Sequence, residues 1–288
     1  MDERLIGDVR ATRLPETVLV EPAADLFPDF DAEAVRAHEP WLAPHHYDPA
    51  AGTITMPVSS WLLRAGGRTI LIDTCCGNHK DRLGIAGMHQ LQTPFLERLA
   101  AAGVAPETVD YVLCTHLHLD HVGWNTQLAG GRWVPTFPNA RYVVSRTELE
   151  HAASAPGALE RLVYQDSIAP VVAAGLVETV YGEHGLLDLL TLRPAPGHSP
   201  GHVWIELASA GALGVFCGDI VHSPIQAPFW RWSTRYCEDP LQATATRRRL
   251  LDRCAETNAL LLPAHFNHDP VARVRADGEG FRLAFAAG

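Results

Sequence analysis

Residues 115–121 read Thr-His-Leu-His-Leu-Asp-His and follow directly on an apolar run of the kind that forms a short buried strand. Imidazole and carboxylate groups are costly to bury without a partner, and a metal ion supplies such a partner. Side chains alternate along an extended segment, so His116 and His118 can point the same way. Asp120 and His121 can then reach a second metal position beside the one that His116 and His118 face. The spacing therefore favours two adjacent metal ions over one.

Further metal-binding side chains occur later in the chain, each directly after a strand-like run. They are His198 after 189–193, Asp219 after 213–217, and His265 after 259–262. Glycine or proline turns flank all three, and loops of this kind present functional groups at the edge of a sheet. We therefore expect these side chains to join the cluster at 116–121.

Hydrophobic periodicity outlines the remaining elements. Strands are predicted at 59–64 and 69–73, joined as a hairpin, and at 110–114, 141–145, 189–193, 203–207, 213–217 and 259–262. Helices are predicted at 93–102, 147–153, 159–174 and 240–255, and a terminal hairpin around 277–280. Residues 1–50, rich in proline, are predicted to form an irregular leader packed on the body. No change in composition marks a linker, which favours one domain, 1–288, of sheets sandwiched between helices.

The amino-acid composition limits the classes of binding partner that we expect. Of the 288 residues 47% are hydrophobic, enough for a sizeable core, and the formal net charge is −10. That charge argues against a general binder of nucleic acid or of an anionic membrane, so we expect neither partner. No apolar run reaches the length of a signal-peptide core or a membrane span, which predicts a cytoplasmic location. The six cysteines show no C-x-x-C pair, so neither a zinc finger nor a disulfide framework is indicated.

These segments, in this order, resemble the motif series of the metallo-β-lactamase-fold superfamily. The similarity runs from Ser59 to His265 and includes Leu71-Ile72-Asp73-Thr74 at the second strand. It implies an α/β fold, a four-layer αββα sandwich with the metals at one edge of the paired sheets.

The resemblance also implies a dinuclear centre. Its ligands would be His116, His118 and His198 for one ion, Asp120, His121 and His265 for the other, and Asp219 as the bridge. Zinc is the default metal, and manganese, iron or cobalt could occupy the same ligands. Two ions about 3.5–4 Å apart lower the pKa of a bridging water toward ~7.

Asp219 indicates a subgroup, because β-lactamases of this fold lack a bridging aspartate there. The segments 115–125 and 218–222 look most similar to the N-acyl homoserine lactonase and methyl parathion hydrolase branch. Lactonases place a tyrosine three residues after the bridging aspartate, whereas this chain has His222. His222 is our candidate donor to the developing oxyanion, and Asp120 could orient the nucleophile or pass a proton to the leaving group.

We therefore expect a hydrolase that uses a metal-bridging hydroxide to cleave a small ester, lactone or organophosphate triester. The expected partner is a small-molecule substrate. Alternatives left open are a β-lactamase-type amide hydrolase, an iron sulfur dioxygenase of this fold, a nuclease or phosphodiesterase, and a metal-retaining binding protein without turnover. A homodimer is also left open.

Several other side chains have predicted roles around this site. Asp73 is expected to bond a ligand histidine or its loop, and His202 to make a structural hydrogen bond that holds the His198 loop. Phe229 and Trp230 are candidates for either a substrate pocket or the core. Arg247-Arg248-Arg249 is expected to form a solvated helix face.

Overall fold

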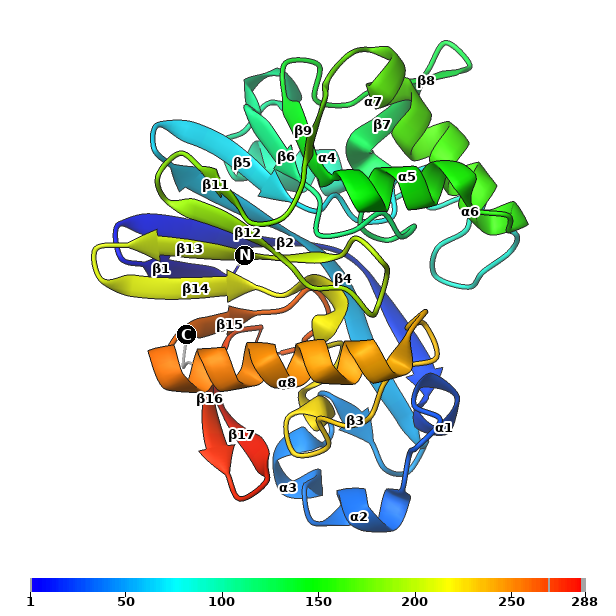
Figure 1. Ribbon diagram of the computed structural model, residues 1–288. Coiled ribbons are helices and arrows are strands. Elements are labelled where there is room, and N and C mark those ends of the chain that lie inside the picture. Colours follow the sequence, from blue (N-terminus) through cyan, green and yellow to red (C-terminus); the bar gives the residue numbers. More distant parts are fainter. Residues whose placement is uncertain (1, 269, 286–288) are drawn as a thin grey trace.

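A computed structural model describes residues 2–268 and 270–285 and shows two β-sheets packed face to face with helices outside them (Figure 1). The first sheet has the order β1-β2-β4-β5-β6-β9-β10, with β3 paired to β4. Its strands are β1 Glu3–Ile6, β2 Val9–Pro22, β3 Tyr47–Asp48, β4 Thr53–Ala65, β5 Arg68–Ile72, β6 Tyr111–Leu113, β9 Arg141–Ser145 and β10 Val177–Val180. The pairs β5-β6, β6-β9 and β9-β10 are parallel, and the others are antiparallel.

The second sheet has the order β11-β12-β13-β14-β15-β16-β17. Its strands are β11 His184–Leu186, β12 Leu190–Pro194, β13 Val203–Ser209, β14 Ala212–Phe216, β15 Leu260–Leu262, β16 Ala272–Asp277 and β17 Gly280–Phe285. Only β14 and β15 pair in parallel within this sheet. A separate hairpin joins β7 Thr126–Ala129 to β8 Arg132–Pro135.

Helices cover the outer faces of both sheets (Figure 1). They are α1 Ala23–Leu26, α2 Ala32–Arg36, α3 Glu39–Leu42, α4 Phe95–Ala101, α5 Arg146–Ser154, α6 Ala158–Val163, α7 Ala169–Ala173 and α8 Pro240–Thr257. A π-helical turn, Tyr164–Ile168, joins α6 to α7. The long α8 lies across the second sheet; the Asp239 side chain caps its first turn and Asn258 ends it in the left-handed conformation.

Alternation along the strands creates three apolar layers between the four structural layers. On β6, Val112 packs toward the helices of the first sheet, whereas Leu113 packs between the sheets. On β15, Leu262 packs between the sheets, whereas Leu261 packs toward α8. Strands buried on both faces read as continuous hydrophobic runs, which is why these short segments were recognisable in the sequence. The predicted αββα sandwich is confirmed.

The prediction that residues 1–50 are irregular is wrong, whereas the prediction that they pack on the body is confirmed. The first part of this segment forms β1 and the 14-residue β2, which pairs along β4. Pro15 lies at a shift of register between Pro15 and Thr17, and Pro22 ends the strand. Because proline is tolerated at a bulge or a strand end, these prolines do not break the strand. The rest of the segment forms α1 to α3 and β3.

Most predicted elements are present at the expected places. The hairpin of β4 and β5 turns through Gly66 and Gly67, whose φ angles of 58° and 72° suit a two-residue turn that requires positive φ. The helix predicted at 159–174 is interrupted by the π-helical turn. The strands β7, β8, β10 and β11 were not predicted. Among the helices of residues 2–268 and 270–285, none combines the length and apolar character needed to cross a bilayer.

The loop after β6 is held against the loop after β5 by backbone contacts. The Gly123 N–H donates to the Cys75 carbonyl at 2.7 Å, and the Thr74 N–H donates to the His121 carbonyl at 2.7 Å. A Cβ on Gly77 would lie 2.6 Å from the Gly123 carbonyl carbon, so neither loop has room for a side chain there. Glycine is therefore required where these loops meet.

We expect Gly123→Ala to lower the free energy of unfolding by about 2 kcal/mol, because its Cβ would overlap the Cys76 carbonyl group and force the loops apart. Urea unfolding followed by circular dichroism measures the change. The matched control is Gly185→Ala in β11, where a Cβ meets nothing within 4 Å. Equal stability of the two variants would contradict the close contact.

Candidate metal centre

The predicted ligand side chains converge at one edge of the paired sheets. They follow β6, β12, β14 and β15 in the chain, and β14 and β15 run parallel, so their carboxyl ends meet at the same edge. The ligand atoms form two groups within which all lie within 4.8 Å of one another. The groups are His116, His118, His198 and Asp219, and Asp120, His121 and His265.

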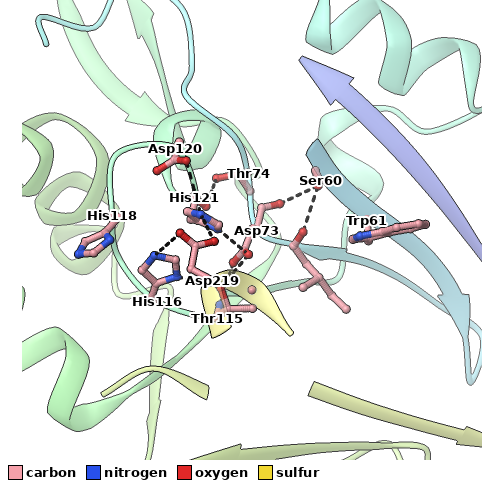
Figure 2. A network of polar contacts seen from close by, with 12 residues as sticks. Ser60, Trp61, Asp73, Thr74, Thr115, His116, His118, Asp120, His121 and Asp219 are labelled. Atoms are coloured by element: carbon pink, nitrogen blue, oxygen red, sulfur yellow. Dashed lines mark hydrogen bonds and ion pairs between the residues drawn. The ribbon is translucent and has the colours of Figure 1, made fainter. Parts of the chain in front are cut away.

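Asp219 lies where the two groups meet (Figure 2). Its Oδ1 is 3.1 Å from His121 Nε2 and 3.0 Å from His265 Nε2. Its Oδ2 is 3.3 Å from His198 Nε2 and 3.7 Å from His116 Nε2. One carboxylate oxygen thus faces each group, as a bridging ligand requires.

The remaining ligand atoms complete each group. Asp120 Oδ2 is 3.6 Å from the Nε2 atoms of both His121 and His265. In the other group, His198 Nε2 is 2.9 Å from His118 Nδ1, so two ring nitrogens face one another.

The chemistry of this donor set fits divalent cations. His116 Nε2 is buried and makes no hydrogen bond within the described part of the chain. Burial, together with the neighbouring imidazoles, holds the pKa of His116 well below its ordinary value, which keeps the ring in the neutral form that ligates metal. For His121, burial opposes protonation, but the carboxylates of Asp219 and Asp120 outweigh it and raise the pKa. A cation would replace the proton that these carboxylates attract.

Asp73, at the end of β5, fixes the start of the motif loop (Figure 2). Its Oδ1 accepts from the Thr115 N–H at 2.8 Å, and its Oδ2 accepts from Thr115 Oγ1 at 2.8 Å. The same Oδ2 is 2.9 Å from His121 Nδ1. The prediction that Asp73 bonds a ligand histidine is confirmed.

His202 and His222 lie beside the centre in different roles. His202 Nε2 accepts from the Asp219 N–H at 3.1 Å, so its side chain holds the Asp219 turn and not the His198 loop as predicted. Burial lowers the pKa of His202 to about 3, which keeps this nitrogen an acceptor. His222 Nε2 is 3.2 Å from Asp219 Oδ2 and lines the cavity above the centre.

Two charged residues that hold the site were not recognised in the sequence. Glu148 accepts from the Leu117 N–H, the Ser199 hydroxyl and the Gly201 N–H, which ties the motif loop to the His198 loop. Arg247, predicted to be solvated, is fully buried. Its guanidinium donates to the Ile220 carbonyl at 2.8 Å, because its face of α8 turns toward the Asp219 turn.

A cavity of about 780 Å³ opens above the centre. Its walls come from β2, the loop at 85–88 and the helices α5 and α6. Its apolar lining residues include Leu19, Met56, Met88, Leu117, Leu159, Val163 and Ile168. Among the described residues that line it there are glutamates and aspartates but no lysine or arginine. Phe229 and Trp230 are not part of the lining; Phe229 stacks on Trp232 instead, so the pocket reading of these two residues is wrong.

A buried ion pair between Arg82 and Asp166 joins two segments that form walls of this cavity. Arg82 bonds both carboxylate oxygens of Asp166, at 2.7 and 2.9 Å, and links the loop that bears 85–88 to the π-helical turn. Lys80 donates to the Asp166 carbonyl at 2.9 Å and to Thr126 Oγ1 at 2.6 Å. Burial lowers the pKa of Lys80 to about 7. The Arg82–Asp166 pair specifies how the walls meet, because Arg82 without Asp166 would be an uncompensated buried charge.

Comparisons with known proteins show the family of this chain. Residues 53–265 match the model of the Metallo-beta-lactamase superfamily. An N-acyl homoserine lactonase of Bacillus thuringiensis is 28% identical over 176 residues, which are 56% of this chain and 62% of that relative. The match therefore covers less than two thirds of the relative's length.

Two solved structures share the fold over nearly their whole length. The hydrolase AbOPH, of the beta lactamase superfamily, superposes with a TM-score of 0.83 at 27% identity, covering 99% of this chain and 97% of that one. The dizinc quorum-quenching lactonase AidC superposes with a TM-score of 0.81 at 19% identity, covering 100% and 97%. Because residues 53–265 match the family model and the chain has this fold, it belongs to the metallo-β-lactamase superfamily.

Proposed function

We propose that this chain is a hydrolase that holds two divalent metal ions and cleaves small uncharged esters, lactones or organophosphate triesters. The observation that carries the proposal is the buried Asp219 carboxylate, with one oxygen toward each group of ligand side chains. The N-acyl homoserine lactonase relative supports an ester-opening reaction.

The predicted ligand set is retained in the proposal. His116, His118 and His198 would hold one ion, Asp120, His121 and His265 the other, with Asp219 shared between them. When bound, such ions lower the pKa of a shared water and polarise a carbonyl or phosphoryl oxygen. Zinc suits nitrogen and oxygen ligands of this kind, and manganese, iron or cobalt are further candidates.

Asp120 and His222 are the proposed catalytic residues. Asp120 lines the cavity, and its Oδ2 lies between His121 and His265, so a proton received there could pass to the leaving oxygen. His222 also lines the cavity; its Nε2 lies 3.2 Å from Asp219 Oδ2, and its Nδ1 makes no hydrogen bond to a described residue. With Asp219 engaged by metal, the His222 ring could donate to the oxygen on which charge develops.

The cavity favours an uncharged substrate with an apolar part. Its walls are largely aliphatic, and its lining carboxylates include Glu160 and Glu238 with no described lysine or arginine to offset them. The part of a substrate that reaches the metal ions would meet positive charge, but a negative charge elsewhere on the molecule would meet these carboxylates, and that repulsion is only partly screened. This charge pattern argues against substrates with a negative charge away from the reacting group, as in anionic β-lactams.

Removal of metal is expected to abolish ester hydrolysis, and zinc, manganese or cobalt to restore it. Asp120→Asn should lower kcat by roughly 10²-fold or more while the protein stays folded, because the amide cannot relay a proton. Steady-state kinetics on metal-quantified protein measure both effects. Wild-type turnover by Asp120→Asn, or by the metal-free chain, would sink the proposal.

His222→Ala should lower kcat by roughly 10²-fold, the loss typical of one oxyanion donor. His222→Gln, which keeps an N–H donor, should recover part of that loss. Metal content and unfolding midpoint serve as controls, since His222 lies 3.2 Å from Asp219. Unchanged turnover by His222→Ala at wild-type metal content would remove His222 from the mechanism.

Charge selection is measured with two 4-nitrophenyl esters of similar length, the neutral butyrate and the anionic hemisuccinate. We expect the neutral ester to have a kcat/KM roughly 10-fold higher, the factor that about 1.4 kcal/mol of repulsion gives. Glu160→Gln should narrow the ratio, and a chromogenic cephalosporin, itself anionic, should be a poor substrate. An equal or inverted ratio would contradict an electrostatic role for the cavity.

A further inference from the structure

Four of the five ligand histidines present Nε2 to the centre and turn Nδ1 toward a neighbouring protein group; they are His116, His121, His198 and His265. In the group with Asp120, these outer nitrogens meet strong acceptors: His121 Nδ1 is 2.9 Å from the Asp73 carboxylate, and His265 Nδ1 is 2.9 Å from the Pro57 carbonyl. A carboxylate or carbonyl partner fixes the ring and raises its basicity toward metal.

The three-histidine group has weaker outer partners. His116 Nδ1 is 3.1 Å from Thr115 Oγ1, a hydroxyl whose proton is given to Asp73. His198 Nδ1 is 3.8 Å from the thiol sulfur of Cys237. A neutral thiol is a weak acceptor, whereas a hydrogen bond to an ionised group is roughly twice as strong as one between neutral groups. The two groups therefore differ in how firmly the protein supports their rings.

We propose that the Cys237 thiol positions the His198 ring. Because a thiol is a weak hydrogen-bond acceptor, we further propose that the three-histidine site binds its metal ion less tightly than the other site does. The inference rests on the proposed two-metal centre. Net charge points the same way: the other site has Asp120 as a ligand and Asp73 behind His121, whereas the three-histidine site shares only Asp219.

The chain around Cys237 is built to hold the thiol in place. The Glu238 N–H donates to the His198 carbonyl at 3.1 Å, and the Asp239 N–H donates to the Gly197 carbonyl at 2.9 Å. Cys237 itself is buried, and Thr234 Oγ1 lies 3.6 Å from its sulfur. The thiol is thus a fixed neighbour of His198.

The same segment forms part of the cavity wall. Tyr236 and Glu238 line the cavity on either side of Cys237 in the chain. The Tyr236 hydroxyl donates to Glu21 at 2.6 Å, and Glu238 is 2.8 Å from His151 Nε2. A displacement of this wall would therefore move the thiol that supports His198.

The test is release of zinc from the fully loaded chain during titration with a chelator, with metal measured by a colorimetric indicator. We expect two ions per chain, released in two steps. Cys237→Ala should move the first step to about 10-fold lower chelator concentration and leave the second in place, the lower end of losses seen for outer partners. Cys237→Ser, whose hydroxyl can accept the same hydrogen bond, should recover part of the shift.

Two further variants make the comparison specific. Asp73→Asn should move the second step more than the first, because Asp73 contacts His121 directly and reaches His116 only through Thr115. Cys254→Ala removes another buried thiol, in α8, and should move neither step. Urea unfolding of each metal-free variant shows whether the chain still folds. If Asp73→Asn does not fold, the comparison of Cys237→Ala with Cys237→Ser decides the test.

The proposal is overturned if Cys237→Ala leaves both steps in place, shifts only the second, or matches Cys254→Ala. Co-release in one step that Cys237→Ala does not split would also overturn it. Binding of a single ion by the wild-type chain at saturating zinc is a different result, because it removes the two-metal centre and with it the proposed function.

Discussion

The buried carboxylate of Asp219 is the constraint around which this end of the molecule is organised. Burial disfavours its charge, yet the surrounding histidines hold its pKa well below the ordinary value. The turn that bears it is held by its N–H to His202 and by Arg247 on the Ile220 carbonyl. Gly218 has a φ of 47°, and a Cβ there would meet Thr115 Oγ1 at 2.7 Å, so only glycine fits between the turn and the motif loop.

The sequence predicted the parts of this site that are local. The spacing within residues 116–121 is short enough for the backbone alone to bring several ligands together. Asp219 and His265 could be added because each follows an apolar strand, and strand ends meet at a sheet edge. By contrast, β2 was missed because Pro15 predicts a break, while its tolerance depends on a bulge that only pairing with β4 reveals.

The cavity could not be predicted because its walls are assembled from segments distant in the sequence. Arg82 and Asp166 look like surface charges in the sequence, and their burial follows only from the docking of one loop on the π-helical turn. Arg247 is similar, since its position on α8 says nothing about the free carbonyl that it meets. Such residues obey no local periodicity, because their partners are set by tertiary packing.

The carboxylates around the cavity have two roles: they hold its walls together, and they disfavour substrates with an exposed negative charge. Glu148 accepts three hydrogen bonds that join the two ligand-bearing loops, so its negative charge cannot be removed without loosening them. Glu21 is bonded by Tyr236 and Arg235, and Glu238 pairs with His151. Each of these acids holds a wall segment; Arg235 offsets the charge of Glu21, whereas Glu148 and Glu238 have no described lysine or arginine partner and contribute negative field inside. A cavity that must keep these carboxylates for its own architecture is poorly suited to anions, and its aliphatic surface is left to discriminate among neutral substrates by shape.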